Sequence, residues 1–398
     1  MKPGSAKTGV FLIEGINAFA TSYYGSYVYF WMKHRFGFSQ ADNLALSALI
    51  GFIYIGGALW GGRYAQKQGY FPALRLGIGL MSGGLLCAAL IHNIPGQLAG
   101  VAIWTLGMCL MWPTLEALAS EGESWTGLQR KIGIYNLTWA AGAALAFFFG
   151  GALIEQLGWA SLFWLPIGLH LFQYVYLVFQ ENPQSPESTH ESLATPKAVA
   201  PHENGSAISP EGARSFLRMA WVANPFAYIA INSVIPVIPD LASRLELTPM
   251  MAGFVCSVLY VARLVAFAIL WFWPGWHYRF KWLASAYGTL LGSYAALLLI
   301  PNLWVIILAQ VFFGLAVGLI YYSSLFYSMD VGDTKGEHGG FHEAAIGTGL
   351  FAGPATGAFT MYFLPRYTQS GALAVCGLLL IGGIVLWRLR RQTHPARH

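Results

Sequence analysis

Charged residues are scarce in this chain of 398 residues, because Asp, Glu, Lys and Arg make up only 10% of it. A soluble globular protein has about 25%, so the deficit excludes an ordinary water-soluble domain. Cysteine is also rare, and Cys87, Cys109, Cys256 and Cys376 all lie inside apolar runs. Their spacing matches no metal site, so we expect buried free thiols, no metal and no cofactor. No nucleophile–base pair or phosphate-binding loop is present either, which argues against an enzyme.

Apolar runs are abundant instead: 56% of the residues are hydrophobic, and the chain has 46 glycines and 15 tryptophans. Glycine is typical of closely packed membrane helices, and tryptophan of the membrane interfaces. A membrane helix needs about 20 apolar residues. The runs therefore predict an all-α integral membrane protein surrounded by lipid. Its twelve helices are expected at about 9–32, 44–65, 72–92, 96–119, 131–154, 159–180, 216–240, 250–273, 281–300, 302–328, 339–364 and 370–388.

A polar segment divides these helices into two sets of six. It contains five prolines and has no aromatic residue between Phe179 and Phe216. Such a composition cannot bury enough apolar surface to offset the entropy of ordering, so it predicts a flexible linker. We expect an N-terminal bundle at 1–180, a linker at 181–214 and a C-terminal bundle at 215–398.

The basic residues predict the orientation in the membrane. With the N-terminus in the cytoplasm, seventeen of the 22 lysines and arginines fall on the inner side, and only Lys33, Arg35, Arg244 and Arg366 on the outer side. Since cytoplasmic loops are enriched in Lys and Arg, both termini and the linker are expected to be cytoplasmic, in a cell (inner) membrane. The net charge of +5 therefore indicates topology and not nucleic-acid binding.

The two halves also share a pattern of glycines. Gly107, Gly133, Gly142 and Gly150 each have a glycine 207 residues later, at Gly314, Gly340, Gly349 and Gly357. Four matches at one offset predict a parallel repeat of six helices.

Twelve spans in two sets of six, joined by a long inner linker, resemble the major facilitator superfamily. The resemblance covers nearly the whole chain in topology and implies two bundles related by a pseudo-twofold axis. The family's loop motif, Gly-x-x-x-Asp-Arg/Lys-x-Gly, matches here at Gly62, Lys67 and Gly69, while Gln66 replaces the acid. In the family this loop latches the cytoplasmic side of the two halves, so these residues are gating candidates.

A second motif of the family, glycine-rich and associated with antiporters, is divided between the halves. The helix at 131–154 keeps the glycines but lacks the Gly-Pro pair, whereas the helix at 339–364 has Gly349, Gly353, Pro354 and Gly357. These four are conformational candidates and favour export; the alternative is that they only serve helix packing. The family's arginine of the fourth helix is absent, since Ile103 stands near its place.

Charges inside the predicted spans are the main candidates for function, because they are costly in a membrane. Arg263 lies in the middle of the helix at 250–273, with Tyr260 one turn away. Its guanidinium matches a carboxylate or phosphate with two hydrogen bonds, so we interpret it as a clamp for an anionic or zwitterionic solute. The alternative is a structural pair with a carboxylate of another helix.

Four further residues are candidates for proton coupling: Glu14, Glu116, His342 and Glu343. The alternatives are an interfacial carboxylate for Glu14 and helix capping or a cytoplasmic gate for the others. Polar and aromatic residues of other spans are expected to line a substrate cavity with Arg263, namely Asn17, Tyr24, Asn136, Trp139, Tyr228, Asn232 and Tyr321.

The sequence thus predicts a secondary transporter of a small organic solute that works by alternating access, with protons as the candidate coupling ion. We expect a monomer. Two alternatives remain: an uncoupled facilitator or flippase for amphiphiles, and a receptor or assembly factor that does not transport.

Overall fold

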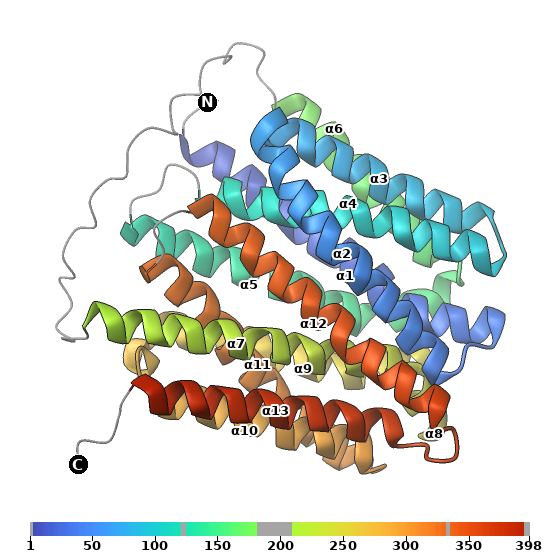
Figure 1. Ribbon diagram of the computed structural model, residues 1–398. Helices are drawn as coiled ribbons and strands as arrows, with labels where there is room; N and C mark the ends of the chain where they lie inside the picture. The colour runs from blue at the N-terminus through green and yellow to red at the C-terminus, as the bar shows by residue number, and fades with distance from the viewer. Residues whose placement is uncertain (1–2, 121–124, 181–208, 332–334, 394–398) are drawn as a thin grey trace.

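The computed structural model describes residues 3–120, 125–180, 209–331 and 335–393. All regular structure in these ranges is helical (Figure 1). The elements are α1 Pro3–Phe36, α2 Gln40–Gln68, α3 Tyr70–Leu90, α4 Ile94–Ser120, α5 Trp125–Leu157, α6 Ser161–Gln180, α7 Pro210–Val234, η1 Ile235–Val237, α8 Ile238–Arg244, α9 Pro249–Phe272, η2 Pro274–Trp276, α10 Phe280–Leu299, α11 Leu303–Val331, α12 Lys335–Phe363 and α13 Ser370–Thr393.

The twelve predicted spans are all present, and most helices extend beyond the predicted ends. The seventh span consists of α7 and α8 joined by the 3₁₀ turn η1. It begins at Pro210, so the last five residues of the predicted linker belong to the helix. The start is set by Ser209, whose side chain accepts a hydrogen bond from the Gly212 N–H, and by the proline at the first helical position.

Ten of the spans are long and apolar enough to cross a membrane by composition. Within the described ranges, α1 and α12 are the two that do not reach this level of hydropathy. Both carry a buried carboxylate, Glu14 in α1 and Glu343 in α12. Their polarity therefore points to a role inside the protein, and not to a position outside the membrane.

The helices form two six-helix bundles, each around its own core. The first core is drawn mainly from α1–α6, and the second mainly from α7–α13. A few side chains cross over: Phe267 and Tyr321 of the second half pack into the first core, and Phe147 of α5 packs into the second. The start of α1 and the end of α13 lie at the same end of the molecule (Figure 1). We call this the terminal end, and the opposite end, where α1 ends, the distal end.

The predicted repeat is visible in one pair of glycines. Gly142 lets α5 approach α1, since a Cβ there would lie 2.9 Å from the Gly15 carbonyl oxygen. Its counterpart Gly349 lets α12 approach α7, since a Cβ there would lie 2.6 Å from the Pro225 carbonyl oxygen. The same helix pair thus packs through the same glycine in both bundles. Gly107 and Gly314 also pack closely, but against non-equivalent helices, α3 and α9.

The glycines of α12 are packing residues that place this helix between the two halves. Gly353 lies against the Ile229 carbonyl oxygen of α7, and Gly357 against Leu44 of α2. Pro354 lies inside the helix. These contacts support the alternative that the glycines of the antiporter-like motif serve helix packing.

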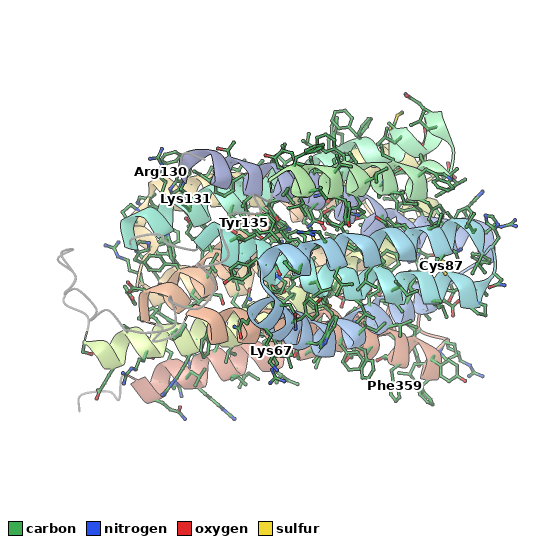
Figure 2. All side chains as sticks on the ribbon, turned by 90° about the horizontal axis from the view of Figure 1, so that it is seen from above. Lys67, Cys87, Arg130, Lys131, Tyr135 and Phe359 are labelled. Carbon is green, nitrogen blue, oxygen red and sulfur yellow. The ribbon has the colours of Figure 1, made fainter. Side chains whose placement is uncertain are left out.

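The loop between α2 and α3, whose sequence resembles the family's cytoplasmic latch, differs in part from the predicted structure. Gly69 has a φ of 92°, so the turn between α2 and α3 needs a glycine. Gly62, however, faces open space, so it does not provide the predicted close approach. Lys67 is exposed and forms no ion pair with any described residue (Figure 2). A charge-based latch at this loop has no support among the described residues.

All four cysteines carry free thiols. Only Cys109 is fully buried, whereas the other three are half-buried. The prediction of buried thiols was therefore too strong for Cys87, Cys256 and Cys376.

Candidate functional site

Arg263 lies in the middle of α9 and is only 2% exposed. Two glycines of α11 set the distance between this helix and its neighbour. A Cβ on Gly314 would lie 3.1 Å from the backbone nitrogen of Arg263, and a Cβ on Gly318 would lie 3.7 Å from its Cγ. Because both neighbours lack side chains, the stem of Arg263 passes between the two helices toward the first bundle.

The guanidinium of Arg263 is surrounded by four aromatic rings, which we call the arginine cage. Its central carbon lies 4.4 Å from the ring centroid of Trp139 and 4.9 Å from that of Tyr321. Phe267 and Tyr228 lie at 5.4 and 6.0 Å. Trp139 comes from α5 of the first half, so the cage is shared by the two bundles. Cation–π attraction of this kind stabilises a guanidinium away from water.

Much of the hydrogen-bonding capacity of Arg263 is not used by the described residues. Its Nε and Nη2 groups are buried and have no hydrogen-bond partner. Among the described residues no carboxylate lies within ion-pair distance of it. The alternative of a structural ion pair is therefore not realised in this part of the chain. A buried guanidinium with free donors is suited to an anion that enters from outside.

Three carboxylates, which we call the acidic cluster, lie near each other at the boundary of the two halves: Glu14 of α1, Glu116 of α4 and Glu343 of α12. Glu14 is fully buried and interacts with the Tyr135 side chain, but neither of its oxygens has a partner at hydrogen-bond geometry among the described residues. Glu343 is 3% exposed and accepts a hydrogen bond of 2.5 Å from the Tyr54 hydroxyl. Glu116 is partly exposed. The three therefore differ in access to water although they interact electrostatically.

Tyr54 is positioned by close packing of α2 on α4. Gly57 allows the approach, since a Cβ there would lie 3.2 Å from the Cβ of Cys109. The Cys109 thiol donates to the Tyr54 carbonyl oxygen over 3.9 Å, a weak bond. Pro113, one turn further along α4, cannot continue the normal hydrogen-bonding pattern of the helix. The α2–α4 contact thus directs Tyr54 across the boundary to Glu343.

The arginine cage and the acidic cluster belong to one continuous site. The indole of Trp112 contacts that of Trp139 edge to face, with 6.1 Å between centroids. Glu116 follows Trp112 by four residues and so lies on the same face of α4. Tyr228 and Tyr321 of the cage also interact electrostatically with Glu116 and Glu343. One positive group and several acidic groups are therefore linked through neighbouring aromatic residues.

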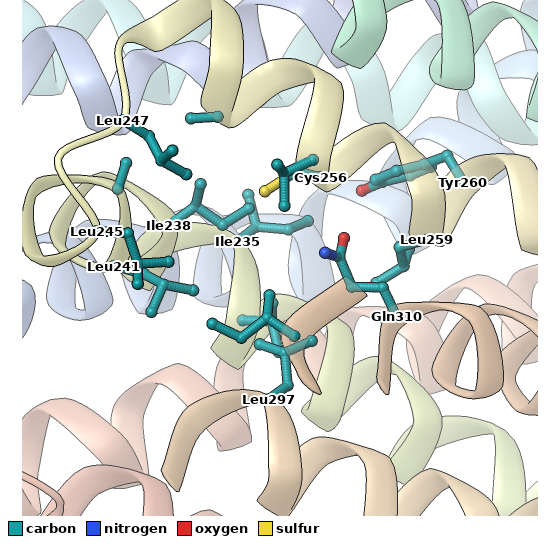
Figure 3. Close-up of a pocket in the computed structure, with 15 residues that line it drawn as sticks. Ile235, Ile238, Leu241, Leu245, Leu247, Cys256, Leu259, Tyr260, Leu297 and Gln310 are labelled. Carbon is teal, nitrogen blue, oxygen red and sulfur yellow. The ribbon is translucent and has the colours of Figure 1, made fainter. Parts of the chain in front are cut away.

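Three predicted substrate residues are not part of the arginine cage, although Tyr260 interacts electrostatically with Arg263. Tyr260 stacks on Phe147, with 4.1 Å between centroids, and lines a small apolar cavity of about 20 Å³ beside Gln310 (Figure 3). Asn232 donates to the Tyr228 carbonyl of its own helix over 2.9 Å. Tyr24 packs inside the first bundle. Residue spacing along a helix did not show which neighbour each side chain would meet.

Asn17 and Asn136 are buried and neither amide atom has a partner in the part of the chain that the structure describes, so they remain candidates for binding. The side chain of His342 lies outside the described residues. Sequence reasoning missed Phe267, Tyr54 and Tyr135. Phe267 had a signal, since it follows Arg263 by one helical turn. Tyr135, which interacts electrostatically with Glu14, and Tyr54 gave no signal beyond being aromatic.

The two halves also meet at the distal end, in a set of contacts that we call the distal seam. It is formed by Lys33, Gln40, Gly151 and Glu155 of the first half and Asp240, Arg244, Pro249 and Met250 of the second. The Lys33 ammonium lies 2.5 Å from Asp240, and the Glu155 carboxylate accepts the Met250 backbone N–H at 2.8 Å. Gly151 allows direct contact with the backbone of Pro249. The distal end is therefore closed.

Comparisons with known proteins agree with this architecture. The sequence model of the family described as Major Facilitator Superfamily matches residues 10–330. A crystal structure of a bacterial homolog of the human lysosomal transporter Spinster, in an inward-facing conformation, has a TM-score of 0.69 at 13% identity and covers 99% of this chain and 96% of its own. The nucleoside transporter NupG has a TM-score of 0.70 at 11% identity, with 96% and 99% covered. At these identities the similarity shows the fold. No curated protein sequence matches the chain.

Proposed function

This chain belongs to the major facilitator superfamily and is a secondary transporter, and on that premise we propose that it couples the movement of an anionic or zwitterionic organic solute to protons. The observation that supports this proposal most directly is the environment of Arg263. A guanidinium at 2% exposure with two unpartnered donor groups and no described counter-ion is unfavourable unless a ligand completes it. The surrounding rings hold it in place by cation–π contacts and leave its Nε and Nη2 groups without an acceptor. A solute carboxylate or phosphate supplies the missing acceptor.

The proton is assigned to the acidic cluster. A carboxyl that moves between a buried and a hydrated setting exchanges a proton with water, because burying its charge is costly. Glu14 and Glu343 are buried in this state, and Glu343 is bonded to Tyr54 of the other half. Separation of the halves at this point breaks that bond and exposes the carboxyl. The acidic cluster is therefore suited to link protonation to the conformational change.

The closed distal seam supports alternating access. We assign the terminal end to the cytoplasm because the basic loops lie there, with Arg130 and Lys131 at one end of the molecule (Figure 2). The closed distal seam then faces the outside, and its opening alternates with opening on the cytoplasmic side. A monomer suffices for this cycle, since both halves are in one chain.

A second candidate function rests on a groove in the surface facing lipid. It has a volume of about 740 Å³ and is lined mainly by apolar residues of α1, α5, α6 and α9, including Phe19, Phe149 and Phe254, with Gln156 as a polar member. An acyl chain fits such a groove, which favours an amphiphile as the solute. An amphiphile with an anionic headgroup satisfies both observations.

The experiment is solute binding and uptake by the purified protein in proteoliposomes. Organic anions, zwitterions and cations are screened by thermal shift, and hits are tested for uptake. Arg263→Ala should weaken binding by about 30-fold or more, the expected cost of leaving a charge unpaired in a buried site. Arg35→Ala, at the exposed end of α1, is the matched control. Unchanged binding and uptake of every hit in Arg263→Ala contradicts the proposal.

A further inference from the structure

We infer that the second bundle binds an anionic phospholipid at its terminal end, with the phosphate of the headgroup between the start of α10 and the end of α13. Five cations of this region form what we call the basic patch: Arg279, Lys281, Arg388, Arg390 and Arg391. The lipid belongs to the surrounding membrane, and its binding is independent of which solute is transported.

The packing of α10 on α13 brings the two parts of the basic patch together. The ring of Phe280, at the start of α10, lies 6.1 Å from that of Trp387, near the end of α13, centroid to centroid. The guanidinium of Arg390 lies 5.2 Å from the centroid of the Phe280 ring, and that of Arg391 lies 5.7 Å from the centroid of the Trp387 ring. A cation–π contact uses the flat face of a guanidinium, so the N–H groups at its edge remain suited to a further acceptor.

No acidic side chain on these two helices balances the basic patch. The chain has no Asp or Glu between Glu246 and Asp330, and none after Glu343. Asp330, at the end of α11, approaches the loop before α10, where its carboxylate accepts a hydrogen bond from the Tyr278 hydroxyl. The four exposed cations of the patch, all but Arg390, have no described carboxylate within ion-pair distance. Their charge is therefore left for an anion from outside the protein.

The basic patch lies where a lipid headgroup can reach it. Only 28% of the residues in the most apolar stretch of α13 are buried, the lowest share among the ten candidate spans, and α10 has 39%. Both helices lie on the side of the second bundle that faces away from the first (Figure 1). Trp387 is 53% exposed, and exposed indole rings near the ends of membrane helices lie at the interface. Because Arg391 lies over that ring, the patch is at the depth of the headgroups.

The chemistry of the patch favours an anionic phosphodiester. Guanidinium groups bind phosphate oxygens through paired hydrogen bonds, and clusters of about four to eight Lys and Arg beside membrane helices bind anionic lipid headgroups. A phosphocholine headgroup carries its own cation, which weakens this attraction, whereas phosphatidylglycerol has none. The acyl chains then lie against exposed apolar residues of α13, such as Leu380 and Ile384. A basic cluster that only sets the topology would not distinguish these two lipids.

The test measures lipid binding by the purified full-length protein, with phosphatidylglycerol as the probe and phosphatidylcholine of the same acyl chains as its control. Phosphatidylglycerol should raise the temperature of thermal unfolding more than phosphatidylcholine, and native mass spectrometry should show that it is retained. Lys281→Gln/Arg391→Gln should weaken its binding by about fivefold for each cation removed. Arg63→Gln/Lys67→Gln, which removes two exposed charges near the end of α2, is the matched control and should bind like the wild type.

Three results overturn the inference: equal stabilisation of the wild type by the two lipids, wild-type affinity for phosphatidylglycerol in Lys281→Gln/Arg391→Gln, or the same stabilisation by inorganic phosphate without lipid. If the double variant does not fold, the wild type alone decides, because salt screens the attraction between exposed charges. The preference for phosphatidylglycerol should then fall at high salt, and a preference that salt leaves unchanged also overturns the inference. Solute binding through Arg263 is measured separately, so a failure of the proposed function leaves the lipid site standing.

Discussion

The distal seam and the central site both bring charged residues of the two halves together, but they treat the charges in opposite ways. At the distal seam, Lys33 and Asp240 are partly exposed, at 30% and 23%, and they pair directly. In the center, Arg263 and Glu14 are almost fully buried, and neither has an ion-pair partner among the described residues. A partly exposed pair adds about 0–1 kcal/mol and can open easily. A buried charge without a partner is unfavourable, so the binding of a ligand or a proton stabilises it. The first arrangement is suited to a gate, and the second to the transported species.

The largest effect is expected where a buried carboxyl loses its ability to carry a proton. With an imposed gradient of one pH unit, coupling to one proton supports about tenfold accumulation of solute. Glu343→Gln should reduce this to no accumulation, while exchange of solute without a gradient continues. Uptake into proteoliposomes measures both. Glu246→Gln, at an exposed position of the distal loop, is the control. Tenfold accumulation by Glu343→Gln excludes this residue from coupling.

A second prediction concerns the closed state of the distal seam. A Cβ at Gly151 would lie 2.6 Å from the Met250 Cα, so Gly151→Val should hold the seam open and reduce uptake several-fold. A cysteine at Ser47, which is buried between the halves, reports the opening. In a background without native cysteines, its labelling by a membrane-impermeant thiol reagent should rise in Gly151→Val. Gly56→Ala, which faces open space, should change neither quantity.

A smaller effect is expected for the ion pair of the seam. Lys33→Ala and Asp240→Ala in a double-mutant cycle should give a coupling free energy of about 0.2–1 kcal/mol in thermal or chemical unfolding. Exchanging the two residues, Lys33→Asp with Asp240→Lys, should restore part of the stability lost in the single variants. The restoration should be incomplete, because Asp240 also pairs with Arg244 at 3.0 Å and the exchange breaks that pair. A coupling free energy of several kcal/mol would show that this pair behaves like a buried ion pair, and it would contradict the contrast between the distal seam and the central site.

The smallest effect lies outside both regions, in the loop after α9. His277 stacks on Phe326, with 4.0 Å between centroids, and burial lowers the pKa of its imidazole to about 4. In the unfolded chain the imidazole of His277 binds a proton more readily than in the folded protein. The contribution of neutral His277 to the free energy of unfolding is therefore complete above about pH 6.5 and is lost as the pH falls toward 4. His277→Phe should lose less stability between pH 7.5 and pH 5 than the wild type in thermal unfolding. An identical loss in both proteins contradicts the assignment.

The twelve membrane spans could be predicted from the sequence, because each is a long apolar run and few structures other than a helix satisfy the backbone hydrogen bonds in lipid. The sequence also indicated Arg263, since a charge in the middle of a span is rare. The partners of Arg263 were harder to predict, because the cage draws on α5, α7, α9 and α11. Tyr54 and Glu343 are 289 residues apart, and no local pattern predicts that contact.

Local hydrogen bonding and packing explain why two predicted cavity residues lie outside the arginine cage. Asn232 satisfies its amide on its own helix, although its spacing suggested a cavity residue. Tyr24 shares a helical stripe with Asn17, yet the stripe turns toward Trp104 of α4 within the bundle. A polar residue in a membrane helix thus signals that some partner is needed, but not which one.

The ion pair of the distal seam shows where the two halves stop being alike. Lys33 and Asp240 are 207 residues apart, the offset that relates Gly142 to Gly349. This offset does not hold between α1 and α7, because Gly142 packs on the Gly15 carbonyl oxygen and Gly349 on the Pro225 carbonyl oxygen, and these two residues are 210 apart (225 − 15 = 210). Lys33 and Asp240 are therefore not equivalent positions, and each half contributes to the seam a charge that the other half does not repeat.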